Sequence, residues 1–232
     1  MSKKINTKLI KLVKYYSLIN HNLILGNKSI NRYEKKQVFV KKEKAQELNN
    51  LRDIISKIKN CKLKENASNL VFSDGNPNSK IMIIGEGPGA NEDKEGLPFV
   101  GRAGQLLDKM LNAINLSRDN VYITNVVNYR PPENRKPTEQ EVVRYLPFLK
   151  SHISIINPKI ILLLGSTAMN ALLNNTDVIS KMRGKWYEIE VNNLKINFIV
   201  SFHPAYLLRQ PDQKKFSWID LKMIREKLLK FK

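Results

Sequence analysis

Apolar residues after residue 80 fall into short runs that alternate with stretches of helical spacing. The runs have the length of buried strands. They are 81–84, 121–127, 160–164, 186–191 and 195–201. The helical stretches are 103–114, 138–156, 166–173 and 218–229. Strands and helices that alternate over short connections predict an α/β fold: a single-domain open, mostly parallel sheet with helices on both faces.

Cap and turn residues support these boundaries. Thr138 is followed three residues later by Glu141, the pattern of a capping box at a helix start. Ser166 is a suitable cap for the next helix. The pair Asn192 and Asn193 predicts a turn between the last two strands.

The first residues differ from the rest in charge. The chain carries a net charge of +19, and residues 1–50 hold 12 basic and 3 acidic side chains. We therefore expect a basic N-terminal extension over 1–45 and the folded domain over 46–232. Two interpretations of the extension stay open: an arm that binds DNA, or a helical appendage or tail with no such role. The total charge favours a polyanionic partner such as nucleic acid, although abundant lysine is also typical of AT-rich genomes.

Other classes are disfavoured by what the sequence lacks. No apolar run reaches the roughly 20 residues of a membrane span, and no signal peptide is expected. Cys61 is the one cysteine, so no intramolecular disulfide can form, and a reducing, cytoplasmic location is expected.

Polar side chains stand where the expected strands end. Glu86 lies in the glycine-rich loop 85–89, Asn125 ends the second strand, and His203 follows the last. The carboxyl ends of parallel strands meet at one edge, where ligands bind, so we expect an acid, an amide and an imidazole in one crevice. The loop matches neither nucleotide-binding fingerprint, which leaves a nucleotide-binding enzyme as a distant alternative.

Each of these features also has a plain structural interpretation. A glycine loop is often a tight turn, yet a turn needs no carboxylate such as Glu86. Phe99 is either a core aromatic or a ring that stacks on a base. The basic, proline-rich loop 130–137 is either a phosphate contact or a solvated connection. Residues 206–209 either start a helix or wedge into a base stack.

Several long motifs, in order, resemble family 4 uracil-DNA glycosylase. The resemblance covers roughly 46–230. Its motifs lie at 85–93 (GEGPGANED), 96–107 (GLPFVGRAGQLL), 124–127 (TNVV), 130–132 (RPP) and 203–209 (HPAYLLR).

The resemblance implies a uracil-DNA glycosylase-like αβα sandwich and assigns roles residue by residue. Glu86 and His203 would be catalytic, with His203 donating to uracil O2. Phe99 would stack on uracil, Asn125 would bond its Watson–Crick edge, and Glu92 would exclude the methyl group of thymine. Further contacts to uracil would come from Gly87 and Pro88. The DNA-binding residues would be Arg130, Arg135, Ser166, Leu207, Leu208 and Arg209.

We therefore expect a monofunctional, monomeric glycosylase that flips uracil from DNA and hydrolyses its N-glycosidic bond in base excision repair. No lysine is needed for a Schiff base, so no lyase activity is expected. Relatives that trap uracil covalently carry an extra histidine in the loop that corresponds to 177–185. This sequence has no histidine there, so we expect turnover rather than trapping. Two alternatives remain: a DNA-binding relative that no longer cuts, and a glycosylase for another deaminated base such as hypoxanthine.

The sequence departs from the family at its iron–sulfur cluster. The resemblance implies four cysteines, but only Cys61 stands at such a position. Ile58, Tyr129 and Tyr145 occupy the other three. Isoleucine cannot ligate iron and tyrosine is a poor substitute for a thiolate. We expect no cluster and no metal, with Cys61 as a lone remnant and the two tyrosines filling the volume.

Overall fold

The computed structural model describes residues 32–231. The chain divides into two units, Met1–Phe39 and Val40–Lys232, and all features below lie in the second unit apart from the start of helix α2 (Arg32–Ser56). Residues 1–31 of the expected extension lie outside the described part. The boundary expected after residue 45 falls within α2 and stays a prediction.

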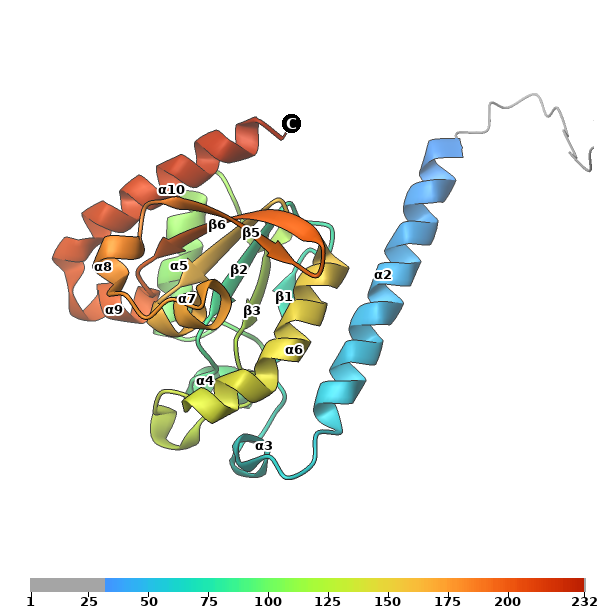
Figure 1. Ribbon diagram of the computed structural model, residues 1–232, viewed down its shortest axis with the longest axis horizontal. Coiled ribbons are helices and arrows are strands. Elements are labelled where there is room, and N and C mark those ends of the chain that lie inside the picture. Colours follow the sequence, from blue (N-terminus) through green and yellow to red (C-terminus); the bar gives the residue numbers. More distant parts are fainter. Residues whose placement is uncertain (1–31, 232) are drawn as a thin grey trace, which may run out of the picture. The chain divides into compact units, whose positions relative to one another are not determined.

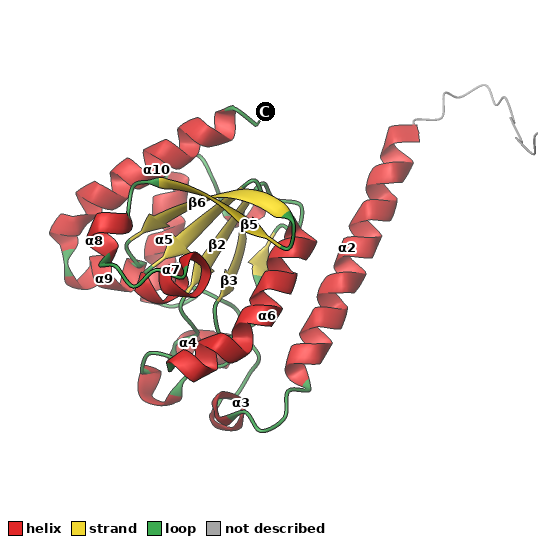
Figure 2. Ribbon diagram, viewed as in Figure 1, coloured by secondary structure: helices red, strands yellow, loops and turns green. Residues whose placement is uncertain are grey.

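A six-stranded sheet forms the centre of the second unit (Figure 2). Its strand order is β1-β3-β2-β4-β6-β5. Strands β3, β2, β4 and β6 are parallel, whereas β1 and β5 are antiparallel edge strands. The strands are β1 (Asp74–Gly75), β2 (Ile81–Gly85), β3 (Tyr122–Asn125), β4 (Ile160–Leu164), β5 (Trp186–Val191) and β6 (Leu194–Ser201). The expected mostly parallel sheet is confirmed.

Two apolar layers enclose this sheet, because alternate residues of each strand point to opposite faces. Met82 and Ile84 pack with α6 (Glu139–Ile156) and α7 (Ser166–Leu173). Ile81 and Ile83 pack with α5 (Arg102–Asn112), α9 (Pro204–Arg209) and α10 (Lys214–Leu229) on the other face (Figure 1). Strands β2 and β4 are buried throughout, which explains their unbroken apolar runs.

Helix starts follow the capping residues. Thr138 Oγ1 accepts a hydrogen bond from the backbone N–H of Glu141 at 3.2 Å, and the Glu141 carboxylate accepts one from Thr138 N–H at 2.7 Å. The predicted capping box is therefore confirmed. The last helix begins at Lys214 rather than at residue 218, because its first turn has one apolar residue, Phe216, which is too little to show the helical period.

Short elements escaped the sequence pattern. They are β1, α3 (Lys62–Asn66), α4 (Ala90–Glu95) and α8 (Ile179–Met182). Helix α4 is almost entirely polar, so it has no apolar face to reveal it. Within residues 32–231, no helix has the length and apolar character needed to cross a membrane.

Candidate active site

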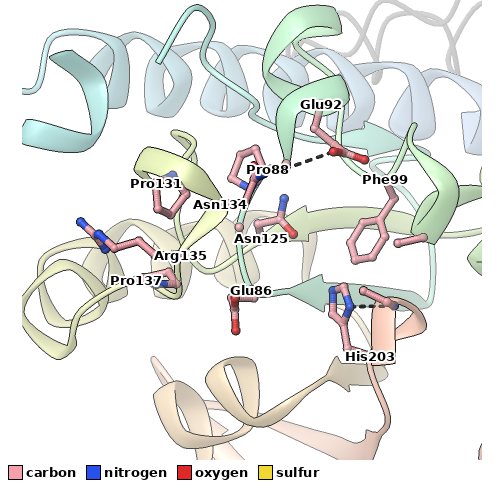
Figure 3. Close-up of a pocket in the computed structure, with 14 residues that line it drawn as sticks. Glu86, Pro88, Glu92, Phe99, Asn125, Pro131, Asn134, Arg135, Pro137 and His203 are labelled. Carbon is pink, nitrogen blue, oxygen red and sulfur yellow. Dashed lines mark hydrogen bonds between the residues drawn. The ribbon is translucent and has the colours of Figure 1, made fainter. Parts of the chain in front are cut away.

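The site lies at the carboxyl edge of the parallel strands. Gly85 of β2 pairs with Asn125 of β3, which places Glu86 and Asn125 at one edge, and His203 follows β6. These side chains gather around a cavity of about 190 Å3 (Figure 3). The uracil-binding and catalytic residues expected from sequence all line it: Glu86, Gly87, Pro88, Glu92, Phe99, Asn125 and His203.

Asn125 is the most unusual polar residue of this cavity. Its side chain is 3% exposed, yet its Oδ1 has no hydrogen-bond partner. A buried polar atom without a partner costs about 1–3 kcal/mol, so such atoms are rare unless a ligand completes them. Gly85 makes room for this amide, since a Cβ there would lie 2.5 Å from Oδ1.

The Phe99 ring forms one side of the cavity and lies 5.5 Å, centroid to centroid, from the His203 ring. Its backbone is left-handed, with φ of 55°. Two contacts hold this conformation. Arg118 donates to the carbonyl oxygens of Pro98 and Phe99, and Gly104 lets Phe99 approach, since a Cβ on it would lie 1.6 Å from the Phe99 oxygen.

Glu92 connects the two loops that bound the cavity. One carboxylate oxygen accepts from the backbone N–H of Gly89 at 3.1 Å. The other accepts from Val100 at 3.0 Å and Gly101 at 2.8 Å. A carboxylate that accepts three backbone hydrogen bonds is fixed in place, so this wall of the cavity is rigid.

His203 is held as a neutral ring. Its Nδ1 accepts a hydrogen bond from the Ala205 backbone N–H at 3.1 Å. The pKa of His203 is lowered from 6.5 to about 4, chiefly by burial and also by the charge of Arg209, whereas Glu92 acts to raise it. The proton of the neutral ring is therefore on Nε2, which is a hydrogen-bond donor at neutral pH.

Glu86 stands between the cavity and a larger one of about 660 Å3, since it lines both. Thr167, near the start of α7, donates its hydroxyl to the Glu86 carboxylate. The larger cavity is also lined by Ser166 and Arg209, two of the expected DNA-binding residues.

The remaining residues that were expected to bind DNA differ in their partners and in their exposure. Arg135 lines the smaller cavity and makes a two-point ion pair with Glu141, at 2.7 and 2.8 Å. Arg130 donates to the Asn134 side chain at 2.8 Å. Leu208 is 36% exposed, whereas Leu207 is 1% exposed and lies in the core. The expectation for Leu207 is thus corrected: neighbouring helical residues point in different directions, and this one points inward.

Several residues of the site were not predicted. Pro131, Asn134 and Pro137 line the smaller cavity, although the loop that carries them was interpreted only as a phosphate contact or a solvated connection. Arg118 and Thr167 act across long sequence separations, and no local pattern marks such contacts.

The positions of the family's cluster also come together. Cys61, Tyr129 and Tyr145 are at most 5% exposed, and Ile58 packs against the core cluster to which they belong. Cys61 Sγ and Tyr145 Oη are 3.4 Å apart, a hydrogen-bond distance. Burial raises the pKa of both tyrosines. One thiol, two neutral phenols and an alkyl side chain do not fit a four-iron cluster.

Polar contacts tie the loop before Cys61 to the domain. Arg144 donates to the carbonyl oxygens of Asn60, at 2.6 Å, and Lys59. Lys64 donates to the carbonyl oxygen of Ser56 at 2.6 Å. Across the described residues, no group of three or more His, Cys, Asp or Glu side chains is placed to hold a metal ion.

Comparison with known proteins agrees with this site. Residues 72–224 match the uracil DNA glycosylase superfamily. The chain is 42% identical over 184 residues to a type-4 uracil-DNA glycosylase of Sulfurisphaera tokodaii, covering 77% of this chain and 84% of that protein. A type-4 uracil-DNA glycosylase of Thermotoga maritima is 44% identical over 156 residues, or 67% of this chain and 80% of that protein. One from Archaeoglobus fulgidus is 39% identical over 186 residues, covering 77% and 94%. The chain therefore belongs to the uracil DNA glycosylase superfamily.

Proposed function

We propose that this chain is a monofunctional uracil-DNA glycosylase, which hydrolyses the bond between uracil and deoxyribose in DNA. The observation that carries the proposal is the buried, unpartnered Oδ1 of Asn125 beside the Phe99 ring. Uracil presents an N3–H donor to that oxygen and an O4 acceptor to the amide nitrogen. Cytosine has no hydrogen on N3, so it would leave Oδ1 without a partner.

The base reaches this cavity by flipping out of the DNA, because its edge and faces are covered within a duplex. A volume of about 190 Å3 suits one small ring, since pockets for drug-sized ligands span about 300–1,000 Å3. The Phe99 ring stacks on the flipped base. Exposed Leu208, with Arg209 beside it, fills the gap that the nucleotide leaves in the stack.

Glu92 excludes thymine. Its carboxylate accepts three backbone hydrogen bonds and cannot turn aside without breaking them. A methyl group on the base would meet this fixed, charged wall. Uracil carries hydrogen in place of that methyl group and avoids the conflict.

The reaction separates charge. The bond between C1′ and N1 breaks, its electron pair leaves with uracil, and water adds to C1′; uracil takes up a proton, and an abasic site remains. His203 donates from Nε2 to uracil O2 as negative charge develops there. One such donor contributes about 3–4 kcal/mol. The Glu86 carboxylate stabilises the positive sugar and orients the water.

The proposed enzyme works without an iron–sulfur cluster. Of the four positions where the family holds its cluster, three carry no cysteine. The proposed catalytic groups, Glu86 and His203, lie apart from them, at the 190 Å3 cavity. We propose a monomer, because the cavity of a single chain already contains every group that the reaction needs. A lone buried thiol suits the reducing cytosol.

The test is excision of uracil from an oligonucleotide by the protein as it is, in the presence of a chelator. Wild type should leave alkali-labile breaks. His203→Ala should slow the reaction by about 10²–10³-fold, and Glu86→Ala should also lower the rate. Oligonucleotides with thymine, cytosine or hypoxanthine serve as controls and should stay intact.

If the protein bound DNA in a salt-sensitive way but produced no alkali-labile breaks, the proposed enzymatic activity would be refuted. The chain would then be a DNA-binding module. Faster release of hypoxanthine than of uracil would refute the substrate alone.

A further inference from the structure

The Glu86 carboxylate has a partner that the proposed function does not use. Thr167 is the second residue of α7, which follows β4, and its Oγ1 donates a hydrogen bond to Glu86 Oε2. Thr167 and Glu86 are 81 positions apart in sequence. Among the described residues, no other side chain hydrogen-bonds this carboxylate.

The proposed role of Glu86 depends on where its carboxylate is held. It lines both the 190 Å3 cavity, proposed to hold uracil, and the 660 Å3 cavity beside it. The bond to be broken joins a base in the first cavity to a sugar outside it, so the carboxylate must stay at the junction. A glutamate has several side-chain torsions, and only one arrangement places the charge there. Catalytic groups need this kind of fixed placement.

We propose that Thr167 is a positioning residue of the glycosylase reaction, which holds the Glu86 carboxylate at the junction of the two cavities. This inference rests on the proposed function. Thr167 itself lines neither cavity, whereas its neighbour Ser166 lines the larger one. Thr167 therefore acts through Glu86, and Ser166 is the residue of this helix start that is open to DNA.

A threonine suits this role for two reasons. Its hydroxyl donates to an ionised carboxylate, which makes a stronger hydrogen bond than a neutral acceptor would. Its methyl group limits rotation about χ1, so the hydroxyl has fewer directions open to it than that of serine. Serine keeps the donor with less restriction, while valine keeps the shape and removes the donor.

A double-mutant cycle tests the inference. Thr167→Val is made in the wild type and in Glu86→Ala, and single-turnover excision of uracil is measured together with the Kd for the DNA. In the wild type we expect a rate loss of about 10- to 100-fold, as for a hydrogen bond to a charged group, with little change in Kd. In Glu86→Ala we expect no further loss, because the group to be positioned is gone.

Three controls keep the result interpretable. Thr167→Ser should restore most of the rate. Thr176→Val, in the exposed loop after α7, should match the wild type. Thr167→Ala carries the same cycle if the valine variant has a lowered Tm.

An equal loss in both backgrounds would overturn the inference, as would no loss in the wild type. A raised Kd for the DNA with an unchanged excision rate would also overturn the inference, because it would show that Thr167 contacts a phosphate of the DNA instead. Absence of excision by the wild type would overturn the proposed function and this inference together, which separates that outcome from the others.

Discussion

The cavity around Asn125 and the cluster of side chains around Cys61 solve different problems within one sheet-based fold. The cavity keeps polar groups with fixed directions: the neutral Nε2 of His203, the unpartnered Oδ1 of Asn125 and the bound carboxylate of Glu92. The Cys61 region is filled by large side chains, Tyr129 and Tyr145, with one weak hydrogen bond.

The difference concerns what each region must supply. The proposed chemistry at C1′ depends on the identity and direction of each donor and acceptor, and the residues expected to carry it all line the cavity. A region that joins segments needs volume and anchoring. Tyrosine rings and the contacts of Arg144 and Lys64 to backbone carbonyls can provide both without metal.

The largest effect should come from emptying the Cys61 region. Tyr145 is 1% exposed, and Tyr145→Ala should lower the free energy of unfolding by about 3–5 kcal/mol, as for other buried aromatic side chains. Denaturant unfolding measures the loss. Excision well below the Tm should stay near that of wild type.

Tyr145→Phe is the matched variant, because it keeps the ring and removes only the hydroxyl near Cys61. It should cost far less stability than alanine. If Tyr145→Ala lowered excision in the fully folded protein, the two regions would not be separable.

The cavity should respond in the opposite way. Asn125→Ala should lower kcat/KM for uracil excision by about 10- to 100-fold, because it removes a two-point hydrogen bond to the base. Its Tm should not fall, because Oδ1 has no partner in the empty site. Asn128 offers a contrast, since its buried amide donates to the Val71 carbonyl at 3.1 Å. Asn128→Ala should lower the Tm and spare the chemistry, and the reverse pattern would contradict both assignments.

A third effect concerns pH and lies outside both regions. His152 is 2% exposed, and its Nε2 lies 2.7 Å from Tyr122 Oη. Burial lowers the pKa of His152 from 6.5 to about 3. Between these values the unfolded chain binds a proton that the folded chain does not. The neutral, buried ring therefore makes its full contribution to the free energy of unfolding above pH 6.5. This contribution falls as the pH drops toward 3, by up to about 1.4 kcal/mol per pH unit.

Unfolding at several pH values, with His152→Phe for comparison, measures this contribution. The variant should show a shallower decline of stability between about pH 6 and about pH 4, where the unfolded chain binds the proton and the folded chain does not. An identical slope would show that the buried ring does not titrate in this way.

Removal of metal ions should have no effect on stability or activity. Dialysis against a chelator should leave both the Tm and the excision rate unchanged, since one thiol and two phenols do not supply the four thiolates that a cluster needs. Iron analysis and visible absorbance of the purified protein are the direct measurements. Loss of Tm with retained excision would show a structural metal in the Cys61 region.

The strand pattern predicted the sheet well because buried parallel strands are apolar throughout, as in 160–164. The same reasoning predicted that Glu86, Asn125 and His203 converge, since the ends of parallel strands share an edge. Two limits were physical. Helix α4 has no apolar face, and the inward direction of Leu207 depends on how α9 packs. The contacts of Arg118 and Thr167 arise only after folding brings distant segments together.

The left-handed backbone of Phe99 constrains how this sequence can diverge over evolution. The ring's position depends on Gly104, where any side chain would collide with the Phe99 carbonyl, and on Arg118, which is held by Asp74 and Asp108. None of these four residues lines the cavity. Descendants of this protein could thus replace many surface positions freely, yet a change at one of these remote residues should be selected against as strongly as a change in the base-binding residues themselves.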